Sequence, residues 1–256
     1  MRETITFIGN GNMALSMAMS LKESYDIEVA GRNSEKLDAF EKNLNIAIVK
    51  NSINNFDITN KTVILCVKPA NIVDMKTVLK GKAKTLYSVL AGTSLELLKK
   101  NIKATSYARA MPNLAATVGK SMTTLTGDFT CKTETEELFS AIGSTLWLGS
   151  EKELDIATAL AGSGPAYLAL VAEALADGAV KQGLKRDDAM TLMRGLFDGF
   201  GSLIQNTHPA LLKDDVMSPG GTTAAGYGAL EQHSVRQGFI AAIESAYSRA
   251  IPRDSL

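Results

Sequence analysis

Residues 4–14 read TITFIGNGNMA, a β-branched and aromatic run that passes directly into two closely spaced glycines. Thr4 to Ile8 has the composition of a short buried strand, and an apolar helical pattern follows through Leu21. In this context Gly9 permits a tight turn, Gly11 lets a pyrophosphate approach the backbone, and Ala14 packs the helix against the sheet. The stretch predicts the first βα unit of a dinucleotide-binding domain. The alternative is a purely structural βα turn.

The rest of the first 150 residues alternates strand and helix patterns. Strands are predicted at 27–30, 46–49, 62–67, 85–90 and 105–110, edge strands at 121–127 and 144–148, and helices at 70–80, 94–100 and 134–142. This alternation is typical of βαβ units, so we expect an α/β domain with a doubly wound, Rossmann-type parallel sheet. Ligands of such sheets lie beyond the carboxyl ends of the strands.

The tip of the second strand indicates which cofactor is bound. An NAD-preferring site usually places Asp or Glu there to accept hydrogen bonds from the ribose hydroxyls. This chain has Gly31-Arg32-Asn33-Ser34 instead, and these side chains are donors suited to a 2′-phosphate. The sequence therefore predicts NADPH, with NADH as the second candidate. The alternative is that Arg32 only solvates a loop.

Composition narrows the classes of partner. The 256 residues are 45% hydrophobic and 21% charged, and Lys plus Arg equals Asp plus Glu at 27 each, so no overall field favours nucleic acid or an anionic membrane. Apolar runs are broken well short of the about 20 residues that a membrane span needs. The chain begins in a strand pattern without a signal-peptide core, and its two cysteines suit a reducing compartment. We expect a soluble, cytoplasmic protein without a metal site.

The second part of the chain is helical. Helices are predicted at 153–160, 165–182, 186–206, 222–232 and 235–250, which gives a dinucleotide-binding domain at 1–150 and a helical domain at 151–256. So many apolar faces in about one hundred residues predict a core shared with another chain, hence a homodimer or a higher homo-oligomer. The segment at 161–166, AGSGPA, interrupts the first two helices. Its glycines either lie under a nicotinamide or form a sharp turn between helices.

The stretch HPALLKDDVMSPGGTT at 208–223 contains a Pro, two Gly and two Thr directly before a helical pattern. Backbone N–H groups at such a helix start lack partners, and hydroxyl groups lie beside them. The stretch is either a nest for a small anion such as a carboxylate or an ordinary helix cap after a turn. His208 is better explained by capping than by proton transfer.

Taken together, the motifs resemble those of the pyrroline-5-carboxylate reductases over essentially the whole chain. The similar blocks occur in the family's order: FIGNGNMA at 7–14, VKP at 67–69, AMPN at 110–113, GSGPAY at 162–167 and the stretch at 208–223. Departures are Leu114-Ala115-Ala116 in place of the usual Thr-Pro-Ala, Ala70 in place of Gln, and Ala224-Ala225-Gly226-Tyr227 after the last block. The resemblance implies an NADPH domain, a helical dimerisation domain and reduction of a cyclic imine carboxylate to proline.

The resemblance also implies roles for individual residues. The substrate carboxylate would be held at Ser218, Gly220, Gly221, Thr222 and Thr223, with the Thr223 hydroxyl as the catalytic group that touches the ring nitrogen. The predicted cofactor residues combine the glycine turn, the strand tips and the AMPN block: Ile8, Gly9, Asn10, Gly11, Asn12, Met13, Arg32, Asn33, Asn51, Val67, Lys68, Pro69, Ala91, Gly92 and Asn113.

Two other functions compete with this one. A β-hydroxyacid dehydrogenase shares the architecture and a Gly-Ser-Gly turn, but it needs a catalytic Lys where this chain has Leu168, and an apolar side chain cannot transfer a proton. A non-catalytic NADP-binding sensor is the other alternative, although a sensor needs no carboxylate anchor.

Overall fold

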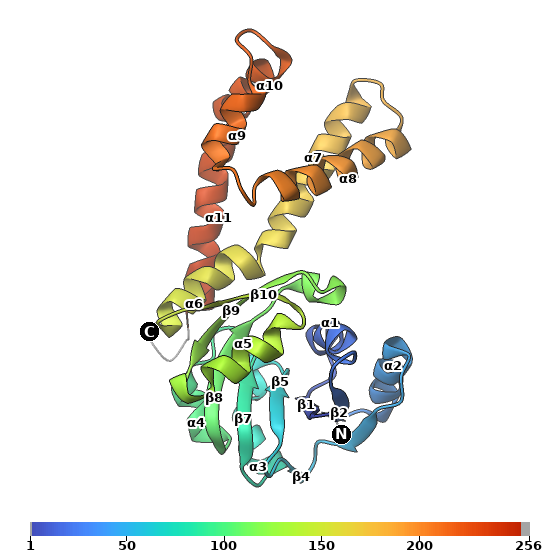
Figure 1. Cartoon of the computed structure of the whole chain (residues 1–256), viewed down its shortest axis with the longest axis vertical. Helices are drawn as coiled ribbons and strands as arrows, with labels where there is room; N and C mark the ends of the chain where they lie inside the picture. The colour runs from blue at the N-terminus through green and yellow to red at the C-terminus, as the bar shows by residue number, and fades with distance from the viewer. Residues whose placement is uncertain (1, 252–256) are drawn as a thin grey trace. The chain divides into compact units, whose positions relative to one another are not determined.

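The computed structural model describes residues 2–251 (Figure 1). It forms two compact units: the sheet unit, Met1–Ser163 with Ser245–Leu256, and the helical unit, Gly164–Glu244. The predicted domain limits of 1–150 and 151–256 stay a prediction.

The sheet unit contains an eight-stranded sheet in the order β10-β9-β8-β7-β5-β1-β2-β3. In chain order the strands are β1 (Thr4–Ile8), β2 (Asp26–Gly31), β3 (Val49–Ser52), β5 (Thr62–Leu65), β7 (Ala83–Ser88), β8 (Ala104–Met111), β9 (Ser121–Gly127) and β10 (Gly143–Trp147). All neighbours pair in parallel except β8 and β9. Because β1 lies between β2 and β5, the direction of chain progression reverses there, and this is where such sheets bind ligands.

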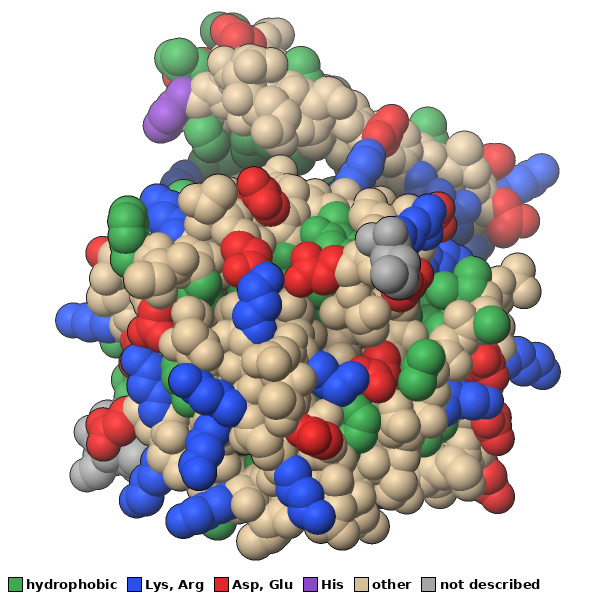
Figure 2. Space-filling model, turned by 60° about the horizontal axis from the view of Figure 1, so that its bottom comes forward, with side chains coloured by type: hydrophobic (Ala, Val, Ile, Leu, Met, Phe, Trp, Pro, Cys, Tyr) green, Lys and Arg blue, Asp and Glu red, His purple; other side chains and the backbone are tan. Residues whose placement is uncertain are grey.

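Helices cover the two faces of this sheet. They are α1 (Asn12–Leu21), α2 (Ser34–Leu44), α3 (Met75–Val78), α4 (Leu95–Asn101), α5 (Lys132–Ser140) and α6 (Glu151–Ala157), with 3₁₀ turns η1 (Pro69–Asn71), η2 (Leu114–Val118) and η3 (Phe129–Cys131). A small second sheet pairs β4 (Phe56–Asp57) with β6 (Leu79–Lys80). Figure 2 shows Lys and Arg side chains next to Asp and Glu over the face it presents, in keeping with the zero net charge.

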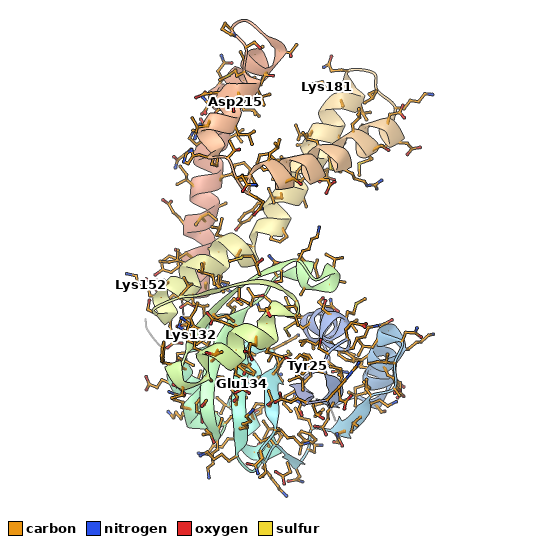
Figure 3. The ribbon with its side chains drawn as sticks, viewed as in Figure 1. Tyr25, Lys132, Glu134, Lys152, Lys181 and Asp215 are labelled. Atoms are coloured by element: carbon orange, nitrogen blue, oxygen red, sulfur yellow. The ribbon has the colours of Figure 1, made fainter. Side chains whose placement is uncertain are left out.

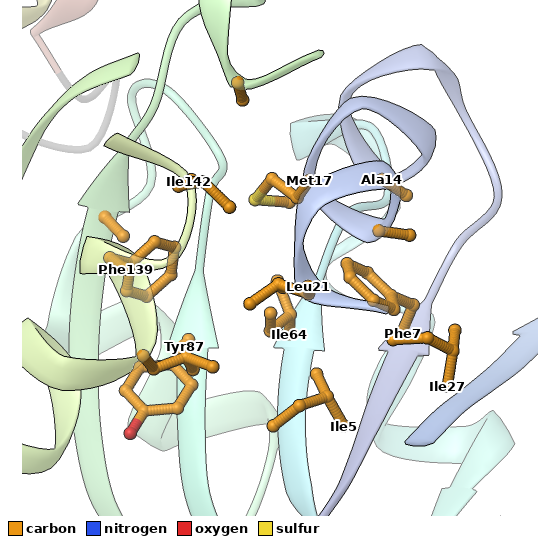
Figure 4. Packing of buried hydrophobic residues seen from close by; sticks show 14 of the residues in the cluster. Ile5, Phe7, Ala14, Met17, Leu21, Ile27, Ile64, Tyr87, Phe139 and Ile142 are labelled. Atoms are coloured by element: carbon orange, nitrogen blue, oxygen red, sulfur yellow. The ribbon is translucent and has the colours of Figure 1, made fainter. Parts of the chain in front are cut away.

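Two hydrophobic clusters form the core, one on each face of the sheet. Alternation along β1 places Phe7 in the cluster under α1, α2 and α5, where it packs with Met17 and Ile64 (Figure 4). Ile8 lies in the other cluster, under α3 and α4. Burial of each large apolar side chain contributes about 1.5–3 kcal/mol. Since both clusters contain many such side chains, the sheet unit has a core of its own.

Three sequence predictions about this unit were wrong in detail. The segment at 70–80 is not one helix, because β-branched Val78 ends α3 and Leu79 pairs in β6. The third strand begins at Val49 and not at 46, because Asn45 ends α2 in a left-handed conformation. Ser121–Gly127 is not an edge strand, since β10 pairs along its outer side, and Thr123 and Thr126 are buried there.

The helical unit contains α7 (Gly164–Lys181), α8 (Arg186–Leu203), α9 (Pro209–Val216), α10 (Thr222–Gln232) and the larger part of α11 (Val235–Ala250). In Figure 3 side chains project from these helices on several sides, with Lys181 and Asp215 labelled. Large apolar residues such as Leu196 and Phe200 are exposed, and among the described residues of this unit only Ala176 and Ala189 are buried hydrophobics. The unit has almost no core within a single chain.

Helical structure runs through Glu151–Lys181, in which a π-helical turn at Thr158–Gly162 connects α6 to α7. This is the one helix in the described chain that is long and apolar enough to cross a membrane by length and composition, and 17% of its apolar window is buried. The core helix of a soluble protein passes the same test. Of the two alternatives for the segment at 161–166, the sharp turn between helices is wrong, since helical structure continues through the π turn that contains Gly162. The placement of its glycines under a nicotinamide stays a prediction.

Candidate functional site

The glycine turn after β1 lies where three strands end together. The Gly9 N–H donates to the Ala30 carbonyl at the end of β2 over 2.9 Å. Gly9 has a φ of +105°, and a Cβ there would lie 2.7 Å from the carbonyl oxygen of Cys66, just beyond β5. Only glycine fits this position, because the clashing atom belongs to the backbone.

The next residues leave the start of α1 open. Gly11 is the N-cap in an extended conformation, no side chain caps the helix, and the first turn has no acidic residue. A Cβ at Gly11 would meet nothing within 4 Å. The first N–H groups of α1 therefore have no capping side chain and fit a pyrophosphate, whereas the Gly9 N–H already donates to Ala30. The predicted pyrophosphate contacts of Gly9 to Met13 stay a prediction.

Arg32 and Asn33 follow β2 at the same edge of the sheet. The Arg32 side chain is exposed, and its Nη2 lies 3.3 Å from Asp74 Oδ2. Such exposed pairs are weak, so the guanidinium remains available to a phosphate. The Asn33 Oδ1 instead accepts from the N–H of Lys36 at 2.9 Å and caps α2.

Asn51 lies inside β3, whereas the sequence suggested that it follows a strand. Its Nδ2 donates to Glu28 Oε1 at 3.0 Å. The buried Glu28 carboxylate also accepts from Thr6 Oγ1 at 2.6 Å and from Lys61 Nζ at 2.7 Å. Sequence reasoning missed Glu28, although a single Glu in the strand DIEVAG is a signal of a buried polar network.

The ends of β5 and β7 supply the other predicted cofactor residues. Lys68 is exposed and precedes η1, and Pro69 is the first residue of that turn. Ala91 is exposed and Gly92 has a φ of +64°. Together with Val67, these residues lie at the carboxyl edge of the sheet. Their contact with a cofactor stays a prediction.

Both polar atoms of the Asn113 side-chain amide form hydrogen bonds. Its Oδ1 accepts from the Ala115 N–H at 3.0 Å, and its Nδ2 donates to the carbonyl oxygen of Ala161 at 2.9 Å. Ala161 belongs to the π-helical turn. The structure thus brings two predicted blocks into contact, AMPN at 110–113 and the Gly-Ser-Gly segment.

The predicted substrate residues lie in the helical unit, in the turn between α9 and α10 and in the first turn of α10. Gly221 is the N-cap of α10, no side chain caps it, and the first turn has no acidic residue. Gly220 has a φ of +70°, while Ser218, Thr222 and Thr223 are exposed. The Gly221 N–H already donates to the Ser218 carbonyl at 3.0 Å, so only the N–H groups from Thr222 onward remain for an anion.

Thr223 also lines a groove of about 560 Å³ between α8, α9 and α10. The walls are mostly apolar and include Leu196, Phe200 and Leu203. Lys213 and Thr223 also line the groove, which therefore reaches the first turn of α10. His208 caps α9, with its Nδ1 accepting from the Ala210 N–H at 3.2 Å, as the sequence suggested.

Other reactive groups lie outside these places. Burial raises the pKa of the Cys66 thiol, which keeps it neutral and unreactive. Within residues 2–251, no group of three or more His, Cys, Asp or Glu could hold a metal ion. Among the described helices, α1 and α10 each begin at an extended glycine that no side chain caps, which leaves an open helix start for an anion in each unit.

Residues 151–252 match the family model described as pyrroline-5-carboxylate reductase dimerisation, and residues 4–92 match the one described as NADP oxidoreductase, coenzyme F420-dependent. The pyrroline-5-carboxylate reductase of Helicobacter pylori strain J99 is 33% identical over 96% of this chain and 98% of that protein. The chain belongs to the pyrroline-5-carboxylate reductase family.

Solved structures of this family have the same fold. The 1-pyrroline-5-carboxylate reductase of Streptococcus pyogenes matches with a TM-score of 0.85 at 29% identity, covering 96% of this chain and 97% of that one. The pyrroline carboxylate reductase of Plasmodium falciparum, solved with NADP bound, matches with a TM-score of 0.79 at 24% identity over 96% and 98%, a likeness of fold alone.

Family membership confirms the predicted family, the α/β fold with a helical C-terminal region, and the enzyme class of an NAD(P)H-dependent oxidoreductase. The match over 151–252 gives the chain a dimerisation region, so the reductase forms a homo-oligomer. That region includes the exposed apolar helices of the helical unit, which explains why they lack a core in one chain.

Proposed function

We propose that this reductase converts 1-pyrroline-5-carboxylate to L-proline, the last step of proline biosynthesis, with NADPH as its cofactor and NADH as a weaker substitute. The observation that carries the proposal is the pair of uncapped helix starts, one after Gly9 to Gly11 and one after Gly220 and Gly221. The first fits a pyrophosphate, and the second fits the single carboxylate of the substrate.

The nucleotide would be held at the carboxyl edge of the sheet. The turn from Ile8 through Asn10 and Asn12 to Met13 supports the pyrophosphate, and Arg32 pairs with the 2′-phosphate. Asn33 and Asn51 shape the ribose side through the bonds that fix them. Val67 to Pro69, Ala91, Gly92 and Asn113 form the wall toward the nicotinamide.

NADPH, when bound, supplies the hydride that the imine carbon receives. The N–H groups of Thr222 and Thr223 hold the substrate carboxylate, and Ser218 and the two glycines shape the turn around it. The Thr223 hydroxyl bonds the ring nitrogen and orients it. A protonated iminium needs no strong acid from the protein, so catalysis is mainly positioning, which supplies up to about 7–11 kcal/mol in model reactions.

The oligomer is at least a homodimer, and the protein works as a soluble, cytoplasmic enzyme without nucleic-acid or membrane partners. The partner's helices cover the exposed apolar faces of α7 and α8 in this proposal. The β-hydroxyacid dehydrogenase alternative is disfavoured because Leu168, in α7, cannot transfer a proton.

The test is a turnover assay that follows NADPH oxidation with 1-pyrroline-5-carboxylate and identifies proline as the product. We expect saturable turnover that requires both compounds. Folded oligomer that binds NADPH but does not turn over would overturn the reductase assignment and favour the sensor.

A further inference from the structure

Arg109 is a fully buried cation in β8 that the proposed reaction does not use. Its side chain is 0% exposed. Nη1 lies 2.9 Å from Glu151 Oε1, and Nη2 lies 2.7 Å from Asp155 Oδ1. The two acidic residues are four apart on α6, so they lie on one face of the helix. The guanidinium fork therefore fixes both the distance of α6 from β8 and its rotation about its axis.

This ion pair is a poor way to gain stability. Removing buried charges from water costs about as much as their attraction returns, and well-packed apolar residues often serve equally well. Burial raises the pKa of the Asp155 carboxyl in spite of the opposing effect of Arg109, a sign of this cost. The Arg109 Nε is buried without a partner among the described residues. What the ion pair does provide is a defined geometry.

A second contact holds the same helical segment six residues further along. Within an α-helix the carbonyl of Ala161 would accept from residue 165, but Pro165 has no N–H. The Asn113 Nδ2 supplies the donor instead, at 2.9 Å. Arg109 and Asn113 thus hold the segment from 151 to 161 at two points.

The contact also reaches the loop after β7. Glu151 Oε1, which Arg109 holds, accepts from the N–H of Leu95 at 2.8 Å. Leu95 begins α4, three residues after Gly92. One carboxylate therefore connects Arg109, α6 and the loop that contains the Ala91-Gly92 turn.

We propose that Arg109 is a positioning residue of this reductase. Through Glu151 and Asp155 it holds α6 and the Ala91-Gly92 loop in one arrangement, and so sets the wall that the nicotinamide ring meets. The inference rests on the proposed function, since it assigns that wall to the cofactor. Arg109 itself touches neither substrate nor cofactor.

The deciding experiment separates positioning from packing. Arg109→Met leaves two acidic residues without their cation and should lower both Tm and kcat/KM. The triple variant Arg109→Met, Glu151→Gln, Asp155→Leu removes those charges and should recover most of the Tm. Its kcat/KM should remain about tenfold to hundredfold low, because small misplacements at a reacting centre have effects of that size. The Kd for NADPH should stay within about twofold of wild type, since a mispositioned ring leaves the phosphate contacts intact.

Arg109→Lys is the conservative variant, in which a single ammonium replaces the fork and cannot bond both carboxylates in the same way. It should fold with nearly the wild-type Tm, lower kcat/KM severalfold and speed hydrogen exchange in residues 91–97, where Leu95 loses its fixed acceptor. Lys99→Met is the matched control. Lys99 pairs with Asp128 at 2.9 Å and lies 5.3 Å from the centre of the Tyr107 ring, so its loss should lower Tm slightly and leave kcat/KM unchanged.

Recovery of both Tm and kcat/KM in the triple variant would overturn the inference. Uncharged side chains packed at these three positions would then position α6 and the loop as well as the ion pair does. Wild-type kcat/KM and exchange in Arg109→Lys would overturn it as well. If the wild-type enzyme itself fails to turn over, the proposed function falls, and this outcome is distinct from a variant that behaves like an active wild type.

Discussion

The two units of this reductase bury their apolar residues in opposite ways. In the sheet unit, Phe7 and Ile8 are fully buried in two clusters, one on each face of the sheet. In the helical unit, Leu196 and Phe200 remain exposed although both side chains are large and apolar. The sheet unit is thus complete in one chain, whereas the helical unit needs the homo-oligomer that the dimerisation match indicates.

The strongest test of this contrast places a charge on each unit. Phe200→Asp, in the apolar groove of the helical unit, should abolish the oligomer, because an unpaired carboxylate cannot be buried in an apolar interface. Light scattering should show single chains. Turnover should fall about hundredfold, because the substrate residues at the start of α10 lie on helices that the partner no longer holds in place. Phe129→Asp is the control, since Phe129 is exposed on the sheet unit and should leave the oligomer intact. An intact oligomer in the Phe200 variant would contradict the contrast.

Gly9 in the sheet unit and Gly220 in the helical unit both have a positive φ, but the two differ in the space around them. Gly9→Ala should unfold much of the sheet unit or abolish NADPH binding, because its Cβ would lie 2.7 Å from a backbone oxygen of Cys66. Gly220→Ala meets nothing within 4 Å and has only its φ of +70° against it. Its cost should be about 1–2 kcal/mol, the penalty of a left-handed conformation for an L-residue. Urea denaturation of both variants measures the free energy of unfolding. An equal loss in the two variants would show that the backbone clash at Gly9 adds nothing to the cost of its positive φ.

The sequence predicted local patterns well and long-range neighbours poorly. Thr222–Gln232 and Val235–Ala250 begin and end where the pattern predicted, because helix periodicity is a local property. The sheet order and the inner place of β9 depend on pairing between distant segments, which no local pattern contains.

The same limit applies to the candidate site. The glycine turn was predictable, because Gly-x-Gly after a strand has a steric cause that is visible in the residues themselves. The engagement of Asn51 by Glu28 and of Asn113 by Ala161 was not predictable, since each bond joins segments far apart in the chain. Arg109 in the strand ATSYARAM was the available signal that was overlooked.

Cofactor preference tests the sheet unit at one side chain. Arg32→Ala should weaken NADPH binding by about tenfold to hundredfold, the range for a charge-assisted bond of about 1.5–3 kcal/mol. NADH lacks the 2′-phosphate and should change by no more than about twofold, as the remaining contacts are the same. Asp74→Asn is the control: it frees Arg32 from its 3.3 Å partner and should leave NADPH binding equal or tighter. Equal losses for both nucleotides, measured by calorimetry, would remove Arg32 from phosphate recognition.

Thr223→Ala tests the helical unit at the smallest scale. The lost hydroxyl makes one neutral hydrogen bond in the proposed mechanism, so kcat/KM for the imine should fall about threefold to tenfold. The N–H groups at the start of α10 are backbone and remain in place, so the carboxylate is still held. The Kd for NADPH should not change, because the nucleotide contacts lie in the sheet unit. Thr223→Ser keeps the hydroxyl and should restore kcat/KM, while Thr223→Val keeps the shape and should not. If Ser and Val behave alike, the side chain serves only to pack the apolar groove that Thr223 also lines, and catalysis at α10 rests on its backbone alone.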